Sequence, residues 1–337
     1  SPGPNSGARI VGPVKSLEQR GHMTEISEAG VLEREDETEG VFAAALTPMN
    51  ENLSADHAEM ARHCRWLLDN GCDGLAILGT TGEANSFSID ERLAILDALL
   101  DAGIPARALI PGTGCCALPD TVRLTRHAIG HGTAGVLLLP PFYYKDVSDD
   151  GLFAYFAEAI ERIGDDRLRV YLYHFPQMSA VPFSHELIGR LLAAYPGTVV
   201  GLKDSSGDLD HMTSLARDFP GFKVFAGTER YLLPMLKAGG AGCITAGANV
   251  LCSVIGKLYG LWRTKGGDEE TEGAQARVTE LRLTLERFPM IPAMKQILAG
   301  HTNKPGWATV RPPFTRLDPG EAAELAAAVE EAGLTLP

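Results

Sequence analysis

The chain has 337 residues, of which 45% are hydrophobic and 22% charged, a composition typical of an ordinary globular protein. Its 30 Lys and Arg residues against 43 Asp and Glu residues give a formal net charge of −13, which provides no global attraction to nucleic acid or to an anionic membrane surface. No run of about 18 uninterrupted apolar residues occurs, so the sequence predicts no transmembrane helix.

The first 39 residues differ in composition from the rest of the chain. Pro, Gly and Ser are frequent up to Arg20, and the segment from Glu25 to Glu39 is strongly acidic, without the apolar stretch of a secretory signal. Gly21-His22-Met23 is consistent with a junction between an added leader and a native start at Met23. We therefore expect residues 1–39 to be a tail that is flexible or partly vector-derived.

From Val41 onward, short apolar runs alternate with stretches of helical periodicity. Eight runs have the length and composition of strands: Val41–Thr47, Gly74–Gly79, Ala108–Gly112, Gly135–Pro140, Arg169–His174, Val199–Lys203, Lys223–Ala226 and Gly242–Ala246. Eight strand–helix units in about 210 residues predict an α/β fold, a (β/α)8 TIM barrel over residues 40–250. A doubly wound sheet is the alternative, and the lack of G-x-G-x-x-G after the first strand disfavours it.

After the eighth run the pattern becomes helical. Three segments follow, Leu251–Thr264, Gly273–Phe288 and Pro292–His301, and a last helix is expected from about Asp318 to Ala332. Residues 251–337 are therefore predicted to form a C-terminal helical region that packs on the barrel.

Reactive side chains of such barrels lie at the carboxyl ends of the strands. Lys203 ends the apolar run that contains Val199 and Gly201, and these three residues alternate onto one face, the predicted barrel interior. Burial disfavours a charged ammonium, and a neutral amine can attack a carbonyl carbon to form a Schiff base. The structural alternative is a lysine that extends to solvent or pairs with Asp204.

Residues with hydroxyl groups lie at or just after the carboxyl ends of three other predicted strands. Tyr173 is either a core tyrosine or a phenol that transfers protons near such an imine. Thr80, Thr81 and Gly82 form a Gly-flanked turn whose hydroxyl and N–H groups suit a carboxylate, unless the turn is an ordinary strand–helix connection. Tyr144 belongs to an aromatic pair that suits a packing lid, an oligomer contact or a second phenol of a proton relay.

The histidines do not predict a metal site. We expect no metal at the four that lie on helical segments or helix ends, which are His57, His63, His127 and His131.

Taken together, these segments resemble the dihydrodipicolinate synthase / N-acetylneuraminate lyase family from about Val41 to the C-terminus. Four motifs carry the resemblance: GTTGE at Gly79–Glu83, PFYY at Pro141–Tyr144, YHFP at Tyr173–Pro176 and GLKDSSG at Gly201–Gly207. The resemblance implies a (β/α)8 barrel with a C-terminal helical region, a homo-oligomer (tetramer or dimer), and no metal or organic cofactor.

The resemblance also implies roles for individual residues. Lys203 would be the Schiff-base lysine and Tyr173 the proton shuttle beside it. Thr80 and Thr81, with the N–H groups of the turn at Gly82, would bind the carboxylate of pyruvate, and Thr80 would link into the proton relay.

Two further roles follow from the same resemblance. Tyr144 would be the second tyrosine of the relay, reaching into a neighbouring subunit's site. Ile244 would offer a backbone carbonyl near the bound pyruvyl group.

The chain departs from the family patterns at the end that selects the second substrate. Dihydrodipicolinate synthases resemble Y-N-x-P-x-R-T-G in this loop, and Met178 stands where that arginine would be, so the bidentate carboxylate contact is lost. Glu229 is followed by Arg230 where the neuraminate lyase pattern has an Asp-Glu pair. Ser205, Glu229 and Met178 are expected to line the variable end, whereas His174, in place of the usual Asn, has no assigned role.

The expected function is that of a class I lyase or aldolase that breaks or forms a C–C bond of a 2-oxo acid, with pyruvate as common product or donor and an aldehyde as partner. A keto-deoxy sugar acid is the expected substrate class. The alternatives are 4-hydroxy-tetrahydrodipicolinate synthase, a 2-keto-3-deoxy sugar acid dehydratase, and a non-catalytic paralogue that binds a 2-oxo acid. Neither nucleic acid nor a membrane is an expected partner, and the expected location is the cytoplasm.

Overall fold

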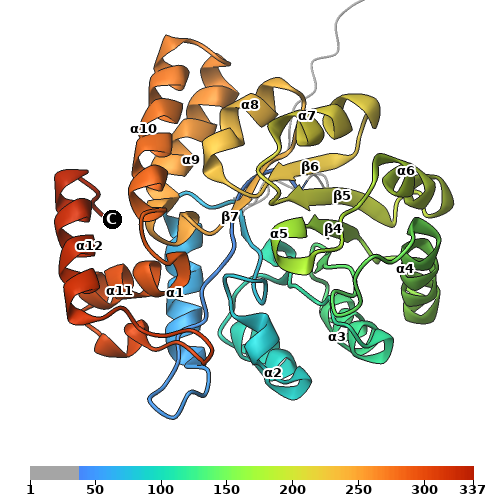
Figure 1. Cartoon of the computed structure of the whole chain (residues 1–337), viewed down its shortest axis with the longest axis horizontal. Helices are drawn as coiled ribbons and strands as arrows, with labels where there is room; N and C mark the ends of the chain where they lie inside the picture. The colour runs from blue at the N-terminus through green and yellow to red at the C-terminus, as the bar shows by residue number, and fades with distance from the viewer. Residues whose placement is uncertain (1–37) are drawn as a thin grey trace, which may run out of the picture. The chain divides into compact units, whose positions relative to one another are not determined.

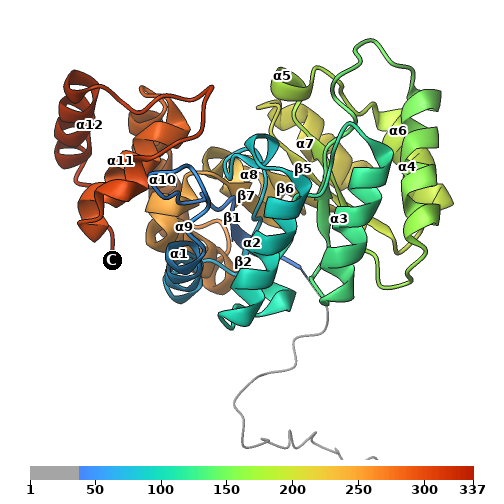
Figure 2. The ribbon, with the colours of Figure 1, turned by 90° about the horizontal axis from the view of Figure 1, so that it is seen from below.

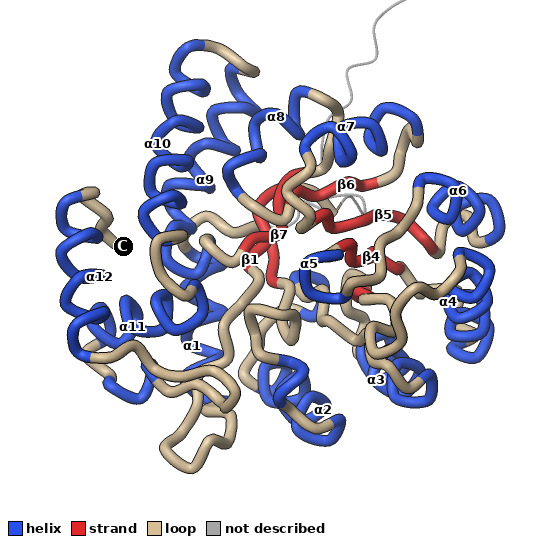
Figure 3. Tube along the Cα trace, viewed as in Figure 1, coloured by secondary structure: helices blue, strands red, loops and turns tan. Residues whose placement is uncertain are grey.

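Seven parallel strands form a single sheet in the order β2-β1-β7-β6-β5-β4-β3. A computed structural model of the chain describes residues 38–337, so the expected tail lies outside the described residues except for its last two. The strands are β1 (Gly40–Ala43), β2 (Gly74–Leu75), β3 (Val136–Leu138), β4 (Val170–His174), β5 (Val199–Asp204), β6 (Lys223–Ala226) and β7 (Gly242–Thr245). They lie at the centre of the fold, with helices around them (Figure 3).

The segment at 109–113 closes the ring between β2 and β3. Leu109 bridges to Leu75 and Gly112 bridges to Leu137, both in parallel. Ile110 donates to the carbonyl of Leu75 at 2.9 Å, and Thr113 to that of Leu137 at 3.1 Å. The third predicted run, Ala108–Gly112, therefore takes its expected place in the barrel. It is not a regular strand, because Pro111 lacks the N–H group that a continuous ladder needs.

Helices surround the strands. They are α1 (His57–Asp69), α2 (Ile89–Asp101), α3 (Leu118–Gly130), α4 (Asp149–Ile163), α5 (Pro176–Ser179), α6 (His185–Ala194), α7 (Leu209–Asp218), α8 (Leu232–Lys237), α9 (Ala248–Lys265), α10 (Glu269–Leu285), α11 (Met290–Thr302) and α12 (Pro319–Glu331). Helices α1 to α4 and α6 to α9 occupy the outer ring, and α10 to α12 extend it on one side (Figure 1). The predicted TIM barrel is confirmed.

Short polar residues cap several of the helices. Ser88 caps α2 in a capping box with Glu91, and Ser184 caps α6. Helix α1 begins at His57, because the carboxylate of Asp56 accepts the free N–H of Glu59. Among the described residues, no helix is both long and apolar enough to cross a membrane.

Two of the three apolar clusters in the described chain lie at the barrel. The larger one fills the layer between the strands and the helices. The smaller one lies inside the barrel and includes Phe42, Tyr171, Tyr173, Phe225 and Ile244. Alternation along each strand produces this division, because successive side chains point to opposite faces. Side chains at strand ends on the inner face therefore converge at one rim of the barrel.

The C-terminal helices lie beside α1 and α9. Helix α10 runs along α9, and α11 and α12 lie farther out (Figure 2). Helix α11 also contacts α9, so this region packs on the same side of the barrel as the first and last strands.

Candidate active site

Lys203 and Tyr173 lie opposite each other at the ends of neighbouring strands. The β4–β5 register pairs these two residues directly. The ammonium nitrogen of Lys203 lies 3.5 Å from the phenolic oxygen of Tyr173 and 4.5 Å from the centre of its ring. Both side chains are buried, with exposed fractions of 4% and 3%. No carboxylate among residues 38–337 forms an ion pair with Lys203, so its nitrogen is not held by a counter-charge.

Glycine makes room for this arrangement. Gly201 lies two residues before Lys203 on the same face of β5 and opposite Tyr171 in the register. A Cβ atom at Gly201 would lie 2.6 Å from the ring of Tyr171. The missing side chain therefore lets the Tyr171 ring fill the barrel below the lysine.

Thr80 extends the Lys203–Tyr173 pair. Its hydroxyl lies 3.2 Å from the phenolic oxygen of Tyr173, so a chain of three polar groups crosses the barrel mouth. Thr81 is buried beside it, with 8% exposed. The Gly82 carbonyl accepts a hydrogen bond from the hydroxyl of Thr47 at 2.8 Å, which fixes the turn to the strand-one segment.

Glu83 attaches the turn that carries Thr80 to the C-terminal region. Its backbone has φ of 56°, a left-handed conformation that is uncommon for a residue with a side chain. Its carboxylate pairs with the ammonium of Lys295 on α11, and both side chains are fully buried. Its second oxygen accepts the N–H of Arg311 at 3.0 Å. The C-terminal region therefore positions the turn that carries Thr80.

A small, partly open pocket lies beside Thr80 and Tyr173, and Asn85 and Arg92 contribute to its lining. Arg92 is 3% exposed and donates to the carbonyl of Gly112 at 2.7 Å. Burial lowers its pKa, and within residues 38–337 its Nε has no hydrogen-bond partner. The sequence analysis missed this cation. Its one signal is a charged residue on the apolar face of α2.

Other predicted residues lie at the same rim but have different surroundings. Ile244 is fully buried on β7, in the cluster that contains Tyr173. Ser205 directly follows β5, is partly exposed, and donates its N–H to the carbonyl of His174 at 2.8 Å.

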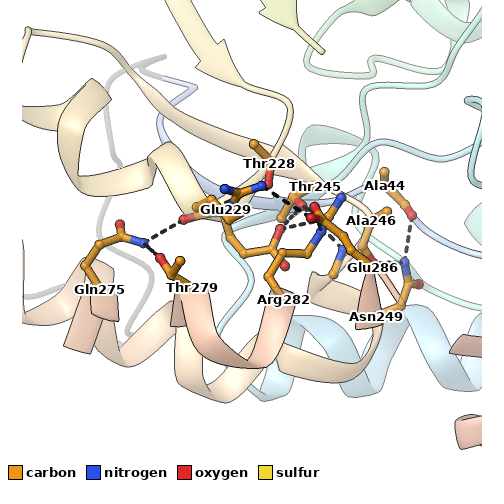
Figure 4. A network of polar contacts seen from close by, with 12 residues as sticks. Ala44, Thr228, Glu229, Thr245, Ala246, Asn249, Gln275, Thr279, Arg282 and Glu286 are labelled. Carbon is orange, nitrogen blue, oxygen red and sulfur yellow. Dashed lines mark hydrogen bonds and ion pairs between the residues drawn. The ribbon is translucent and has the colours of Figure 1, made fainter. Parts of the chain in front are cut away.

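Glu229 belongs to a buried polar network. Its carboxylate accepts hydrogen bonds from the hydroxyl of Thr245 and from the guanidinium of Arg282, the latter at 3.0 Å (Figure 4). Gln275 of α10 binds its backbone carbonyl at 3.1 Å. The side chain of Glu229 is fully buried. These contacts attach the segment after β6 to α10, and none joins Glu229 to Lys203 or Tyr173.

Tyr144 and Met178 are surface residues, with exposed fractions of 74% and 64%. The ring of Tyr144 packs edge-on against that of Tyr143, with their centres 5.3 Å apart. No contact described for the chain joins Tyr144 or Met178 to Lys203 or Tyr173.

A buried polar cluster lies on the outer face of the same two strands. Asp204 is fully buried and accepts a hydrogen bond from His211 at 2.7 Å, which raises the pKa of that imidazole. Burial lowers the pKa of His174, whose Nδ1 accepts the N–H of Phe183 at 3.1 Å. His174 had no role in the sequence analysis, and here it ties the end of β4 to the segment before α6.

Curated proteins with similar sequences match most of this chain. An uncharacterized DapA-like lyase of Chloroflexus aurantiacus is 36% identical over 295 residues, which are 87% of this chain and 97% of the relative. A 4-hydroxy-tetrahydrodipicolinate synthase of Agrobacterium fabrum is 29% identical over 88% of this chain and 98% of the relative.

Solved structures agree with these relatives. Dihydrodipicolinate synthase from Agrobacterium tumefaciens superposes with a TM-score of 0.80 at 34% identity, covering 88% of this chain and 99% of the other. YagE, an Escherichia coli prophage protein solved with pyruvate, gives 0.80 at 25% identity with the same coverage. The model of the dihydrodipicolinate synthetase family matches residues 37–332, so the chain belongs to this family, as its motifs suggest.

Proposed function

We propose that this chain is a class I lyase that forms a Schiff base between Lys203 and a 2-oxo acid. The observation that carries the proposal is the buried ammonium of Lys203, which pairs with no carboxylate of residues 38–337 and lies 3.5 Å from the phenolic oxygen of Tyr173. Membership of a lyase family and a structural neighbour solved with pyruvate support it.

The neutral amine of Lys203 attacks the C2 carbonyl carbon, and loss of water from the carbinolamine leaves an imine. The carboxylate of the 2-oxo acid binds at the turn formed by Thr80 and Thr81. Tyr173, bonded to Thr80, gives a proton to the departing hydroxyl, so that water leaves.

The imine then accepts the electron pair of the C3–C4 bond. In the cleavage direction Tyr173 removes the proton of the C4 hydroxyl, an aldehyde leaves, and an enamine of pyruvate remains. Protonation of the enamine at C3 and hydrolysis of the imine release pyruvate and restore the Lys203 amine. Condensation is the same sequence reversed.

We propose a keto-deoxy sugar acid as the substrate class, because Met178 cannot provide the guanidinium that would hold a second carboxylate. Two alternatives share the imine: 4-hydroxy-tetrahydrodipicolinate synthesis from pyruvate and aspartate semialdehyde, and dehydration of a 3-deoxy-2-oxo sugar acid. The first is the activity named for the Agrobacterium relative. We further propose that the protein is a cytoplasmic homo-oligomer, dimer or tetramer, that works without a metal or organic cofactor.

Borohydride reduction in the presence of pyruvate tests the central step. The wild-type chain should gain one reduced pyruvyl group, mapped by peptide mass spectrometry to Lys203. Lys203→Ala should gain none, whereas Lys257→Ala, which changes an exposed lysine, should be labelled like the wild type. Absence of the adduct in the wild type would favour a non-catalytic binding protein.

Substrate screening separates the enzymatic alternatives. Pyruvate release would be measured from 2-keto-3-deoxy sugar acids and from N-acetylneuraminate, beside condensation of pyruvate with aspartate semialdehyde and loss of water from the sugar acids. Efficient condensation without cleavage would overturn the proposed substrate class but leave the Schiff base intact.

A further inference from the structure

A second cluster of histidine and carboxylate groups lies in the outer helical layer. His127 and His131 are four residues apart at the C-terminal end of α3, and Asp97 lies on the neighbouring helix α2. The Nε2 atom of His127 lies 2.7 Å from Oδ1 of Asp97, and the Nε2 atom of His131 lies 3.3 Å from the same oxygen. Two imidazole nitrogens therefore converge on one carboxylate oxygen.

The spacing of these atoms fits a tetrahedral ion. Ligand atoms at about 2.0–2.2 Å from Zn²⁺ lie roughly 3.3 Å from one another in that geometry. The contact from His131 to Asp97 already has this length, and the contact from His127, at 2.7 Å, is shorter by about 0.6 Å. The two imidazole rings are 77° from parallel, with centres 4.7 Å apart, and one nitrogen of each ring lies with an Asp97 oxygen in a group whose atoms are all within 4.8 Å of one another.

The buried cluster of His174, Asp204 and His211, on the outer face of β4 and β5, does not have this geometry. The rings of His174 and His211 are only 30° from parallel. Hydrogen bonds already use both carboxylate oxygens of Asp204, one by Ser206 and the other by His211. The Phe183 N–H occupies one ring nitrogen of His174. Its polar atoms therefore satisfy one another as hydrogen-bond partners.

The electrostatics at Asp97 favour a cation. Its ion pairs within residues 38–337 are both to histidine, and no Lys or Arg shares its carboxylate. His131 caps the C-terminus of α3, the negative end of the helix dipole. The side chains of Asp97 and His131 are 46% and 44% exposed, so water can reach the site and complete a coordination shell.

We propose that Asp97, His127 and His131 form a binding site for a divalent transition-metal ion, with Zn²⁺ as its reference ligand. The ion replaces the hydrogen bonds between imidazole and carboxylate, and water supplies the fourth ligand. It links α2 to α3 in the outer layer, outside the candidate active site. No metal was expected at these histidines from the sequence. Their four-residue spacing is compatible with one, but the partner on α2 appears only in the fold.

Calorimetric titration of the metal-free full chain with Zn²⁺ at neutral pH tests the site. We expect one binding event that weakens at least about tenfold in His131→Gln and in Asp97→Asn, because each removes one ligand. Excess Zn²⁺ should also raise the melting temperature of the wild type and not of the two variants, since it binds the folded chain.

Two control variants each replace a histidine elsewhere in the chain. His57→Gln changes a histidine on α1, and His185→Gln changes one that faces a single carboxylate, that of Asp218 at 3.3 Å. Both should bind Zn²⁺ as the wild type does. Failure of the wild type to bind Zn²⁺ would overturn the proposal, and so would equal affinity in His131→Gln, Asp97→Asn and the wild type.

Discussion

Lys295 on α11 and Glu83 after β2 form an ion pair in which both side chains are fully buried. The two residues are 212 positions apart in the chain. Lys295 also donates to the carbonyl of Thr309 at 2.9 Å, so the ammonium joins the C-terminal region to the turn that carries Thr80. Burial lowers the pKa of Lys295, while the charge of Glu83 acts in the opposite direction.

Lys295→Met should destabilise the fold strongly, because it leaves the Glu83 carboxylate buried without a counter-charge. Breaking a buried pair in this way costs about 3–5 kcal/mol of unfolding free energy. Urea denaturation measures the change. In the double variant Glu83→Gln/Lys295→Met no charge remains buried, so part of the stability should return. A double variant that is no more stable than Lys295→Met alone would argue against this account.

Tyr173→Phe should lower kcat by about 10²–10⁴-fold, the usual contribution of a positioned proton-transfer group. The ring remains in the barrel interior, so thermal stability should change little. Tyr171→Phe is a matched control, because Tyr171 lies two residues earlier on the same strand and in the same apolar cluster. Steady-state pyruvate release compares the two variants. Equal kcat values would remove Tyr173 from the proton relay.

Met178→Arg should not improve the native reaction if this position lines the end that selects the second substrate. Its exposed side chain allows the substitution without disturbing the core. The ratio of kcat/KM for sugar-acid cleavage to kcat/KM for condensation with aspartate semialdehyde checks the prediction. A variant that gains cleavage activity would contradict this interpretation of the loop.

The sequence could predict where the strands end, because each strand is a short apolar run. Lys203, Tyr173 and Thr80 lie close together in the structure for the same reason, since parallel strands in a barrel bring their carboxyl ends to one rim. The third run was expected to be a strand like the others, but in the structure it makes only two isolated bridges, with Pro111 between them.

Long-range contacts limited the prediction of the site. Glu229 follows a strand and therefore resembles a substrate ligand in the sequence, but Arg282, 53 residues later, pairs with its carboxylate. The pairing of Glu83 with Lys295, 212 positions later, is equally impossible to predict from the sequence pattern. Hydrophobic periodicity places each residue in its own element, and only tertiary packing decides which buried charge meets which partner.

Tyr144 gives a prediction about assembly. Its ring and that of Tyr143 form an exposed aromatic pair, each 74% accessible, and large apolar groups at a surface often mark a contact with another chain. If Tyr144 completes the relay of a neighbouring subunit, Tyr144→Phe and Lys203→Ala should each be nearly inactive alone. Mixed subunits should regain activity, because a hybrid contains one site with both native residues. Light scattering and pyruvate release measure both effects, and a monomeric wild type would exclude this arrangement.

His63 makes stability depend on pH. It is buried, binds Asn249 at 2.9 Å, and packs against Trp307, with ring centres 4.9 Å apart. Burial lowers its pKa from 6.5 to about 4. Between these two pH values the imidazole is therefore protonated in the unfolded chain and neutral in the folded chain. The stabilisation that His63 contributes is complete above the unfolded pKa and is lost as the pH falls toward the folded value.

Between about pH 7 and pH 5 this difference should reduce the unfolding free energy by about 2 kcal/mol. Urea denaturation at several pH values measures it. His63→Gln keeps a polar side chain near Asn249 but cannot take up a proton, so its stability should fall less over the same range. His57→Gln, on the exposed face of the same helix, should follow the wild type. If His63→Gln and the wild type lose stability in parallel, another buried group controls the acid sensitivity.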